Sequence, residues 1–345
     1  MPPRNVLIIQ TAFIGDVILT LPLVQSLRKS FKDLNVSFLA IPSAAGALLN
    51  HPDINEVLLY DKKGAEKDLR SAIRLVGKMR DRHFDAAIVP HRSLRSAALA
   101  RFAKIPVRIG FSTSAGKFLF TRVIDYKGEE HETKRNLNLL AGLDVEIPGV
   151  ELPRVYPSDA DNKWAGEMID GFSEEPLVAV APGSVWNTKR WPMDHYKQLV
   201  SMLATEGINV LLLGSKEDVQ LSGEVAKGLG NQVINLAGRA TLLQSAALMQ
   251  RCRVVVSNDS APMHLSVAVG TPVVAVFGAT VPAFGFGPLG PQDVVVETQG
   301  LACRPCSIHG GETCPIKTFV CMNTISSSAV YEKVISIITG VRTYA

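Results

Sequence analysis

Short apolar runs alternate with longer segments of mixed polarity along most of the chain. In the first half, the runs cover residues 6–9, 36–40, 57–60 and 86–89, and each one precedes a segment of mixed polar and apolar positions. This rhythm is typical of strand–helix–strand units, since the runs are apolar enough to be covered by helices on both faces. The pattern therefore predicts a parallel sheet.

The same rhythm restarts after residue 176. Apolar runs cover residues 177–181, 210–213, 233–236, 254–256 and 273–277. The segment 147–158 separates the two sets, and its prolines and glycine oppose a continuous helix. We therefore predict an α/β protein with two Rossmann-like, doubly wound domains, residues 1–155 and 156–345. The last helix is expected either to stay with the second domain or to pack back on the first.

Composition and charge narrow the class of protein. The 345 residues exceed the usual size of a single-core domain, and 47% hydrophobic with 20% charged residues is a globular composition. A net charge of +4 is too small to indicate a nucleic-acid binder. The start of the chain lacks a signal peptide's apolar stretch, and no uninterrupted apolar run reaches membrane-spanning length. We therefore expect a cytoplasmic protein whose five cysteines stay reduced.

Gly15 and Asp16 follow the first predicted strand, where the chain enters a helix. Loops at the carboxyl ends of strands border the ligand crevice of a doubly wound sheet, so Asp16 is expected to project a carboxylate there. The alternative is that Asp16 only caps the helix and complements its dipole. A single glycine does not make the G-x-G-x-x-G pattern, so a dehydrogenase is disfavoured.

The loop after residues 177–181 combines glycine, hydroxyl and cationic side chains. It contains Gly183, Ser184, Thr188 and Lys189. Such loops hold phosphates with backbone N–H groups, hydroxyls and the point charge of a lysine, which makes Lys189 the leading cation. A surface turn with solvated charges is the alternative.

A second phosphate-type loop follows residues 254–256. Asp259 or Ser260 is expected to cap a helix whose first-turn N–H groups face the same crevice. His264 lies one helical turn after Ser260, so both side chains would face one ligand. A structural histidine is the alternative, although two facing phosphate-type loops favour a ligand.

Taken together, these segments resemble glycosyltransferase family 9, and within it the ADP-heptose:lipopolysaccharide heptosyltransferases, above all the heptosyltransferase II branch. The resemblance rests on Gly15-Asp16, on Pro182-Gly183-Ser184 followed by Lys189-Arg190-Trp191-Pro192, and on residues 258–265. It extends to residues 270–272 and 286–289, and so covers nearly the whole chain.

The resemblance implies a GT-B fold, in which two Rossmann-like domains face a central cleft. The first domain would bind the acceptor and the second the nucleotide sugar. The implied reaction is inverting transfer of L-glycero-D-manno-heptose from ADP-heptose to the lipopolysaccharide inner core, on a heptosyl-Kdo-lipid A acceptor, without a catalytic metal. The protein would work as a monomer at the cytoplasmic face of the inner membrane, touching the membrane surface transiently.

The resemblance also suggests roles for single residues. Asp16 matches the family's proposed general base. The positions that match donor-binding residues are Ser184, Lys189, Asp259, Ser260 and His264, with Lys189 expected on the diphosphate. Ala261 stands where many relatives carry glycine, and its methyl group would crowd a close backbone approach.

The chemistry of such a transfer sets two demands. One carboxylate must take the proton of the acceptor hydroxyl, and the leaving diphosphate needs positive charge nearby. Asp16 would be the base, and Lys189 with the dipole of the helix after Ser260 would offset the leaving-group charge. A carboxylate at a helix N-terminus is expected to have a lowered pKa, which weakens it as a base unless burial counters the effect.

A basic segment in the first domain is the candidate acceptor region. It runs from residue 91 to residue 108, and Arg92 and Arg95 lie nearest the end of the strand at 86–89. Guanidinium groups suit an acceptor that carries Kdo carboxylates and lipid phosphates. A solvated helix face is the alternative. His131 and Arg135 are weaker candidates.

The C-terminal cysteines raise the question of a metal. Cys303, Cys306, Cys314 and Cys321 could supply four thiolates to a structural zinc ion. We favour reduced cysteines in a compact loop, because the cluster contains only one short C-x2-C element. No catalytic role is assigned to them.

Two other functional classes share the expected architecture. A sugar-nucleotide epimerase would need further acid–base residues that the sequence does not indicate, and a non-catalytic module would only bind a sugar nucleotide or a lipid. Within the family, a transferase with another sugar donor or acceptor is the nearest alternative. Asp16 separates catalysis from binding, since only catalysis requires the base.

Overall fold

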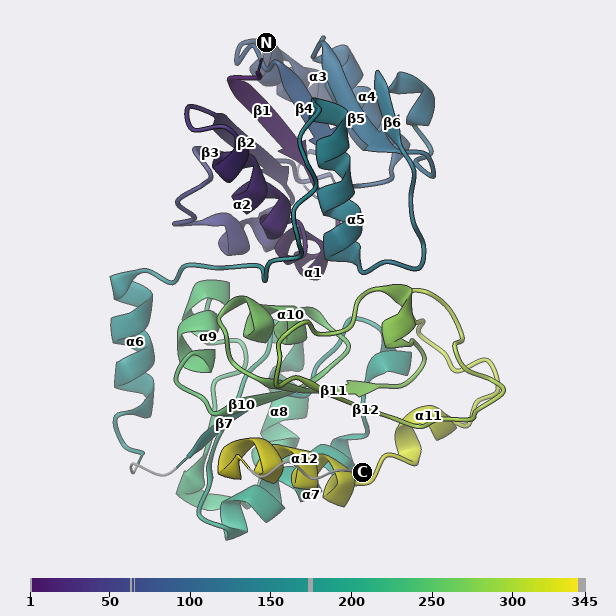
Figure 1. The fold of residues 1–345 in the computed structure, drawn as a ribbon. Helices are drawn as coiled ribbons and strands as arrows, with labels where there is room; N and C mark the ends of the chain where they lie inside the picture. The colour runs from purple at the N-terminus through teal and green to yellow at the C-terminus, as the bar shows by residue number, and fades with distance from the viewer. Residues whose placement is uncertain (1, 63, 65, 173–175, 341–345) are drawn as a thin grey trace. The chain divides into compact units, whose positions relative to one another are not determined.

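The computed structural model describes residues 2–62, 64, 66–172 and 176–340. The chain divides into two compact units, Met1–Tyr156 and Pro157–Ala345. Each unit contains a six-stranded parallel sheet with helices on both faces (Figure 1). Within the described ranges, no helix combines the length and the apolar character that crossing a bilayer requires.

The first unit has the strand order β3-β2-β1-β4-β5-β6. Its strands are β1 (Asn5–Ile9), β2 (Asn35–Ala40), β3 (Glu56–Leu59), β4 (Ala86–Val89), β5 (Val107–Phe111) and β6 (Arg122–Ile124). Its α-helices are α1 (Ile14–Ile18), α2 (Leu21–Ser30), α3 (Leu69–Arg80), α4 (Leu94–Phe102) and α5 (Glu132–Asn138), joined by 3-10 turns η1 (Pro42–Leu48), η2 (Lys117–Leu119) and η3 (Leu139–Leu143). The order reverses between β1 and β4, which is the arrangement of a doubly wound sheet.

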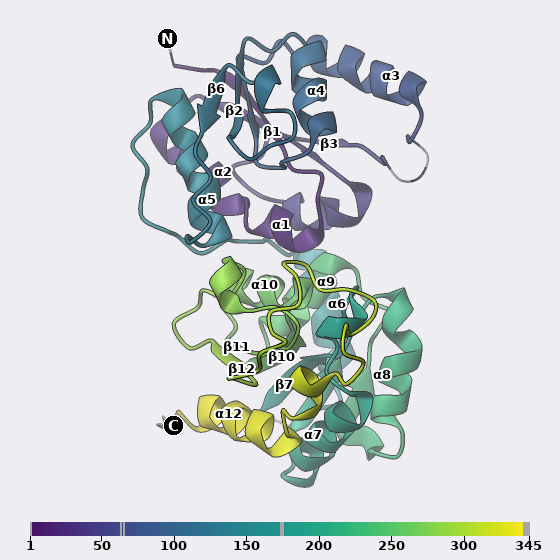
Figure 2. The same cartoon turned by 90° about the vertical axis from the view of Figure 1, so that its right-hand side faces the viewer.

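Helices cover both faces of this sheet. Figures 1 and 2 show α2 and α5 on one face and α3 and α4 on the other. On the α3–α4 side, Leu75 and Met79 of α3 join Leu99 of α4 and the strand residues Leu7 and Ile9 in one buried cluster. Burying such aliphatic side chains supplies the main stabilisation of the layer.

The second unit repeats the topology, with the order β12-β11-β10-β7-β8-β9. Its strands are β7 (Leu177–Ala181), β8 (Asn209–Leu212), β9 (Val233–Asn235), β10 (Val254–Asn258), β11 (Val273–Phe277) and β12 (Val294–Glu297). Its α-helices are α6 (Asp159–Ile169), α7 (Met193–Thr205), α8 (Val219–Ala226), α9 (Leu242–Met249), α10 (Ala261–Ala268), α11 (Val320–Asn323) and α12 (Ser327–Thr339), with 3-10 turns η4 (Asn187–Lys189), η5 (Lys216–Asp218), η6 (Gly230–Gln232) and η7 (Pro282–Phe284).

Trp191 anchors one helical layer of the second unit. Its ring is 2% exposed and contacts the ring of Tyr196 on α7, and its indole N–H donates to the carbonyl of Ile325 at 3.0 Å. Val330 and Val334 of α12 belong to the same buried cluster. The last helix therefore packs on α7 and on the sheet of its own unit, as Figure 2 also shows.

The predicted α/β class with two doubly wound sheets is confirmed, but three strands escaped the sequence reading. These are β5, β6 and β12. The strand β5 carries Arg108 and Gly110 in a five-residue run, while β6 and β12 are sheet edges without a fully buried position. Edge strands need only one hydrogen-bonded neighbour, so they do not require the continuous apolar run that identifies a central strand.

Two glycines of the first unit offer a matched stability test. A Cβ atom at Gly110 in β5 would collide with the buried ring of Phe120, whereas a Cβ atom at Gly77 in α3 would meet nothing within 4 Å. We expect Gly110→Ala to lower the free energy of unfolding by about 1–3 kcal/mol through overpacking. Gly77→Ala should raise it by about 0.5–1 kcal/mol, because alanine loses less backbone entropy in a helix.

Urea unfolding followed by circular dichroism measures both effects. Equal midpoints for the two variants would contradict the packing described around Phe120.

Candidate functional site

The polar candidate residues gather where the strand order of each sheet reverses. Asp16 follows β1 and Arg92 follows β4, on the two sides of the reversal in the first unit. Lys189 follows β7 and Asp259 follows β10, at the reversal of the second unit. Doubly wound sheets bind ligands outside the carboxyl ends of their strands at this point. Each unit therefore offers a candidate site of its own.

Asp16 sits in the first turn of α1 and is half-buried. Its Oδ2 accepts a hydrogen bond from the backbone N–H of Phe13 at 3.2 Å. Its backbone carbonyl accepts a hydrogen bond from the hydroxyl of Thr20 at 2.7 Å. The capping contact considered from the sequence is thus present, and it fixes the carboxylate just beyond β1.

The environment of Asp16 raises its pKa to about 6 from an ordinary 3.8. Burial is the largest cause and the negative charge of Glu132 the second, while the hydrogen bond from Phe13 and the positive charge of Arg92 lower the pKa. The sequence-based expectation of a lowered pKa at a helix N-terminus was therefore wrong. Desolvation and a like charge outweigh the helix dipole here.

Glu132 belongs to a buried hydrogen-bond network that also includes Tyr126 and Arg135. The Arg135 guanidinium, which is 2% exposed, donates to Glu132 Oε2 at 2.9 Å and to the hydroxyl of Tyr126 at 2.8 Å. The guanidinium groups of Arg92 and Arg135 lie 4.4 Å and 4.8 Å from the centroid of the Tyr126 ring. Arg135, a weaker candidate for acceptor binding, is thus occupied by hydrogen bonds to Tyr126 and Glu132. Arg92 contacts the Tyr126 ring and follows β4 at the edge of the sheet.

His91 follows β4 and joins a second polar group at this edge. Its Nδ1 lies 3.0 Å from the hydroxyl oxygens of both Thr11 and Ser96. Burial, with the charges of Lys62 and Arg92 adding to it, lowers the pKa of His91 to about 4. The basic character of the segment 91–108 therefore comes from its arginines and lysines and not from this imidazole.

Two other sequence candidates lie at the margins of the first site. Arg95 is exposed at the start of α4, and its Nη1 lies 3.5 Å from the carbonyl of Lys62. His131 is the N-cap residue of α5, where its Nδ1 accepts from the backbone N–H of Thr133 at 3.2 Å.

In the second unit, Lys189 and Asp259 form a partly buried ion pair. Lys189 Nζ lies 2.6 Å from Asp259 Oδ2, and these side chains are 13% and 6% exposed. The same carboxylate oxygen accepts from the hydroxyl of Thr280 at 2.6 Å. The pair joins the loops after β7, β10 and β11, so the cation is held at the sheet edge in a fixed place.

The ion pair changes the expected cap of α10. Asp259 is engaged by Lys189 and Thr280, and Ser260, the N-cap residue, makes no side-chain capping hydrogen bond. Its hydroxyl lies 3.4 Å from that of Ser257. Ser260 therefore occupies the cap position, as the sequence suggested, but neither side chain makes a capping hydrogen bond. Asp259 instead binds the charge of Lys189.

The remaining candidates of the second unit surround this pair. Ser184 and Ala261 are half-buried, in the loop after β7 and at the first position of α10. His264 is buried on α10, one turn after Ser260. Asn258 ties the two loops together, since its Nδ2 donates to the carbonyl of Pro182 at 2.9 Å.

A distant segment clasps the turn that bears Lys189. Thr188 and Gly311 form a reciprocal pair, in which the Thr188 N–H donates to the Gly311 carbonyl at 3.0 Å and the Gly311 N–H donates to the Thr188 hydroxyl at 2.8 Å. Gly310 has a φ of +83°, and a Cβ atom there would lie 3.1 Å from Lys189 Cγ. The chain around residue 310 therefore packs directly on the stem of Lys189.

The cysteine cluster lies in the same C-terminal segment. Its four members are free thiols, and Cys306 Sγ donates to the carbonyl of Cys303 at 3.3 Å. Burial and the neighbouring thiols of Cys303 and Cys314 raise the pKa of Cys306. Across the described residues, no group of three or more His, Cys, Asp or Glu side chains is placed to hold a metal ion. The zinc alternative for Cys303, Cys306, Cys314 and Cys321 gains no support from this arrangement.

Asp159 and Asp161 have a spacing that could suit a metal ion, but one of them caps a helix. Asp159 and Asp161 are two residues apart at the start of α6, but Asp161 Oδ2 accepts from the N–H and the hydroxyl of Ser158 at 2.9 Å and 2.6 Å. This carboxylate is therefore committed to the capping box of its helix.

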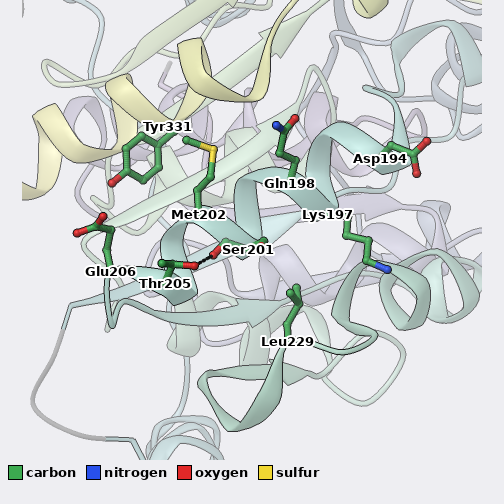
Figure 3. Close-up of a pocket in the computed structure, with 9 residues that line it drawn as sticks. All are labelled: Asp194, Lys197, Gln198, Ser201, Met202, Thr205, Glu206, Leu229 and Tyr331. Carbon is green, nitrogen blue, oxygen red and sulfur yellow. Dashed lines mark hydrogen bonds between the residues drawn. The ribbon is translucent and has the colours of Figure 1, made fainter.

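A pocket of about 600 Å³ is lined by nine residues, none of which is a candidate site residue (Figure 3). Its lining comes mainly from α7, with Leu229 and Tyr331 from neighbouring segments. None of its nine lining residues belongs to the loops after β7, β10 or β11. We do not connect it with the candidate site.

The sequence reasoning missed the residues that act through others. Glu132, Tyr126, Asn258 and Thr280 hold or tune the side chains that the motifs identified. Asn258 is part of the segment 258–265 that the sequence identified, but the sequence around a buried amide does not indicate which groups it will bind. Glu132 and Thr280 lie 116 and 21 positions from the residues they affect.

Comparison with known proteins gives a family and a fold. The profile of glycosyltransferase family 9 (heptosyltransferase) matches residues 72–316. The chain is 29% identical over 297 residues to lipooligosaccharide heptosyltransferase 2 of Haemophilus influenzae, a match that covers 81% of this chain and 85% of that protein.

Two solved structures share the architecture over nearly the whole chain. A glycosyltransferase of family 9 from Veillonella parvula superposes with a TM-score of 0.88 at 21% identity, covering 98% of each chain. The ADP-heptose lipopolysaccharide heptosyltransferase II of Escherichia coli gives a TM-score of 0.81 at 24% identity, covering 98% of this chain and 99% of that one. The fold is therefore GT-B, the fold of these family 9 enzymes.

The charges around Asp16 lead to a titration test. Glu132→Gln removes a negative charge beside Asp16 and should lower its pKa below 6, whereas Arg92→Gln removes a positive charge and should raise it. Glu130→Gln is the matched control, because Glu130 pairs with Lys127 and is not among the groups that shift Asp16. The measurement is a ¹³C NMR titration of aspartate carboxyl carbons, with Asp16→Asn assigning the signal.

An Asp16 pKa near 3.8 in the native protein would contradict the buried environment. Equal values in all three variants would contradict the proximity of Glu132 and Arg92.

Proposed function

This chain belongs to glycosyltransferase family 9, the heptosyltransferase family, and we propose that it moves L-glycero-D-manno-heptose from ADP-heptose to a heptosyl-Kdo-lipid A acceptor of the lipopolysaccharide inner core. Two of the relatives named above are heptosyltransferases of the second type, and the name of one of them includes ADP-heptose, which supports this donor and acceptor. The observation that carries the mechanism is the half-buried Asp16 with a pKa of about 6 at the reversal point of the first sheet.

Asp16 acts as the general base in this proposal. A carboxyl with a pKa near 6 is largely deprotonated at neutral pH, and it is about two units more basic than an ordinary aspartate. It takes the proton of the acceptor hydroxyl while the acceptor oxygen bonds to the anomeric carbon of heptose. The bond from that carbon to the ADP oxygen breaks in the same step, so the configuration inverts and ADP leaves.

The second unit binds the donor. Lys189, held beside Asp259, lies where its charge can offset the diphosphate as ADP leaves. Ser184 and Ser260 supply hydroxyls, and α10 directs its positive end to the same edge. Asp259, Ala261 and His264 complete the set around the phosphates and the sugar, with Asp259 also keeping Lys189 in place. In this proposal the transfer uses no catalytic metal.

The first unit binds the acceptor. Arg92 at the sheet edge and exposed Arg95 at the start of α4 supply guanidinium groups for Kdo carboxylates and lipid phosphates. Because that acceptor is a lipid, we place the enzyme at the cytoplasmic face of the inner membrane, as a monomer that contacts the surface transiently.

The alternatives differ in how they use the same residues. A family 9 transferase with another sugar donor or acceptor would keep Asp16 and Lys189 in their roles. An epimerase or a binding module is disfavoured by membership of a glycosyltransferase family. Replacement of Asp16 distinguishes a transferase from a binding module.

The decisive experiment compares the native protein with Asp16→Asn in a transfer assay. With ADP-heptose and heptosyl-Kdo-lipid A, mass spectrometry should detect the gain of one heptose, and the variant should be slower by roughly 10²- to 10⁴-fold with donor affinity retained. The native kcat/KM should fall as the pH drops below about 6, when Asp16 becomes protonated.

Three outcomes lead to different conclusions. Folded protein that binds ADP-sugars without transferring heptose rejects this sugar or acceptor and favours another family 9 reaction. Full activity in Asp16→Asn removes the general-base role. Failure to bind any nucleotide sugar overturns the donor site.

A second experiment concerns the clasp on Lys189. Thr188→Val keeps the shape of a buried side chain, 3% exposed, but removes the hydroxyl that accepts from the Gly311 N–H. Leaving that N–H unsatisfied loosens the turn, so we expect the KM for the donor to rise roughly 10-fold with a smaller change in kcat.

The matched control is Thr205→Val, which changes an exposed threonine whose hydroxyl bonds within α7. It should leave both constants unchanged. A KM for the donor that is equally unaffected in Thr188→Val would show that the clasp does not position Lys189.

A further inference from the structure

The positive charge of the chain is concentrated in one segment. Residues 67–118 hold twelve of the 36 lysines and arginines but only three of the 32 acidic residues. This segment therefore carries +9, while the rest of the chain carries −5. A separation of this size creates a directed field that the net charge of +4 conceals.

Some of these cations are committed to the protein. Arg82 pairs with Glu56, Arg80 donates to the carbonyl of Phe102, and Arg108 donates to the carbonyls of Leu119 and Ile105. Of the remaining cations, those that are exposed and form no ion pair with any described residue are Lys67, Arg70, Arg74, Lys78, Arg95, Arg101, Lys104 and Lys117.

Large apolar side chains are exposed among these cations. Leu69 is 76% exposed and Ile73 61% on α3, Phe102 is 61% exposed at the end of α4, and Phe118 is 75% exposed on η2. Leu69 and Phe118 exceed every other large apolar side chain in the described ranges. Single exposed apolar residues need no explanation, but α3, α4 and η2 together carry these four and Leu94, which is 48% exposed.

The elements that carry these residues are packed together. The Arg80 guanidinium binds the last carbonyl of α4 at 2.9 Å and 2.7 Å, which ties the ends of α3 and α4 to each other. The turn before η2 lies on α4, since a Cβ atom at Gly116 would collide with Ala97. Figure 2 shows α3 beside α4 on one side of the first unit. We call the outer surface of α3, α4 and η2 the α3–α4 face.

The combination of cationic and apolar side chains on the α3–α4 face is typical of a surface that binds anionic lipids. Lysines and arginines bind lipid phosphates and anionic headgroups, while leucine, isoleucine and phenylalanine insert into the acyl boundary below them. Nucleic acid would use the cations but offers little to exposed aliphatic side chains. A soluble acidic protein would not require four apolar side chains to stay in water before binding.

We propose that the α3–α4 face docks the enzyme on an anionic lipid bilayer. The proposal extends the lipid-linked acceptor of the proposed function to the membrane that carries it. Arg92 and Arg95 lie at the start of α4, so the docked face continues into the acceptor site of the same unit.

Vesicle flotation tests the docking without donor or acceptor. The full chain is mixed with vesicles of phosphatidylethanolamine and phosphatidylglycerol at about three to one, or of phosphatidylcholine alone. We expect binding to the anionic vesicles only, and its loss at about 1 M salt, where the Debye length is about 3 Å.

Two triple variants divide the contributions. Arg74→Gln, Arg101→Gln and Lys117→Gln together should weaken partition roughly 100-fold, since each cation near an anionic surface contributes about five-fold. Ile73→Ser, Phe102→Ser and Phe118→Ser should weaken it at least about 10-fold through lost insertion. Because all six side chains are exposed, circular dichroism should show that both variants stay folded.

Two control variants change exposed residues elsewhere on the chain. Leu49→Ser, Val123→Ser and Val150→Ser remove three exposed apolar side chains of the same unit. Lys32→Gln, Lys163→Gln and Lys227→Gln remove three exposed cations. Both control variants should bind vesicles like the native protein.

The outcomes separate this proposal from the proposed function. Equal loss in the control variants, or binding of a short DNA duplex with the same affinity and the same dependence on the six residues, would overturn the docking face. Heptose transfer to a detergent-solubilised acceptor by a protein that does not float with vesicles would overturn the docking alone. Flotation without transfer would leave the face intact and reject the reaction.

Discussion

All six strands of each sheet run in one direction, and the position of every candidate side chain depends on this constraint. Parallel strands deliver their following loops to a single edge, so residues as distant as Asp16 and Glu132, or Lys189 and Asp259, come together there. The reversal of strand order between β1 and β4, and between β7 and β10, separates the helices that leave this edge. A binding or catalytic site can therefore form when suitable residues occupy the few positions that follow these four strands.

Two carboxylates of the molecule acquire opposite roles from their surroundings. Asp16 is half-buried near Glu132, and this environment raises its pKa to about 6. Asp259 instead contacts the Lys189 ammonium and the Thr280 hydroxyl at 2.6 Å each, so it holds a cation in place. The proposed mechanism uses one aspartate as a proton acceptor and the other as an anchor, because one faces a like charge and the other an opposite charge.

Both sites are supported by segments remote in sequence. In the first unit, Tyr126, Glu132 and Arg135 form a buried network at the start of α5 that touches Arg92 through the tyrosine ring. In the second unit, Gly310 and Gly311 clasp the turn that bears Lys189. Such supports restrict the rotamers of the reacting side chains, and so reduce the entropy lost when a ligand is bound in a reactive geometry.

The sequence by itself determined the architecture and the loops that carry the chemistry. Short, largely apolar runs of three to five residues are typical of strands covered on both faces, and their alternation with mixed segments predicted two doubly wound sheets. Glycine, hydroxyl and charged residues directly after those runs marked the loops of Asp16, Lys189 and Asp259, because local patterns identify local structure. The edge strands β6 and β12 lacked such a pattern and were missed.

Only the tertiary structure decided the burial, the charged neighbours and the hydrogen bonds of these residues. A raised pKa for Asp16, where the helix dipole alone predicted a lowered one, follows from desolvation and from a carboxylate 116 positions away. The ion pair of Lys189 and Asp259 joins two residues that are 70 positions apart. Because Asp259 binds the lysine, α10 lacks the side-chain cap that the sequence predicted. Charge, burial and hydrogen bonding depend on distances through space, so no pattern along the chain records them until the fold has set those distances.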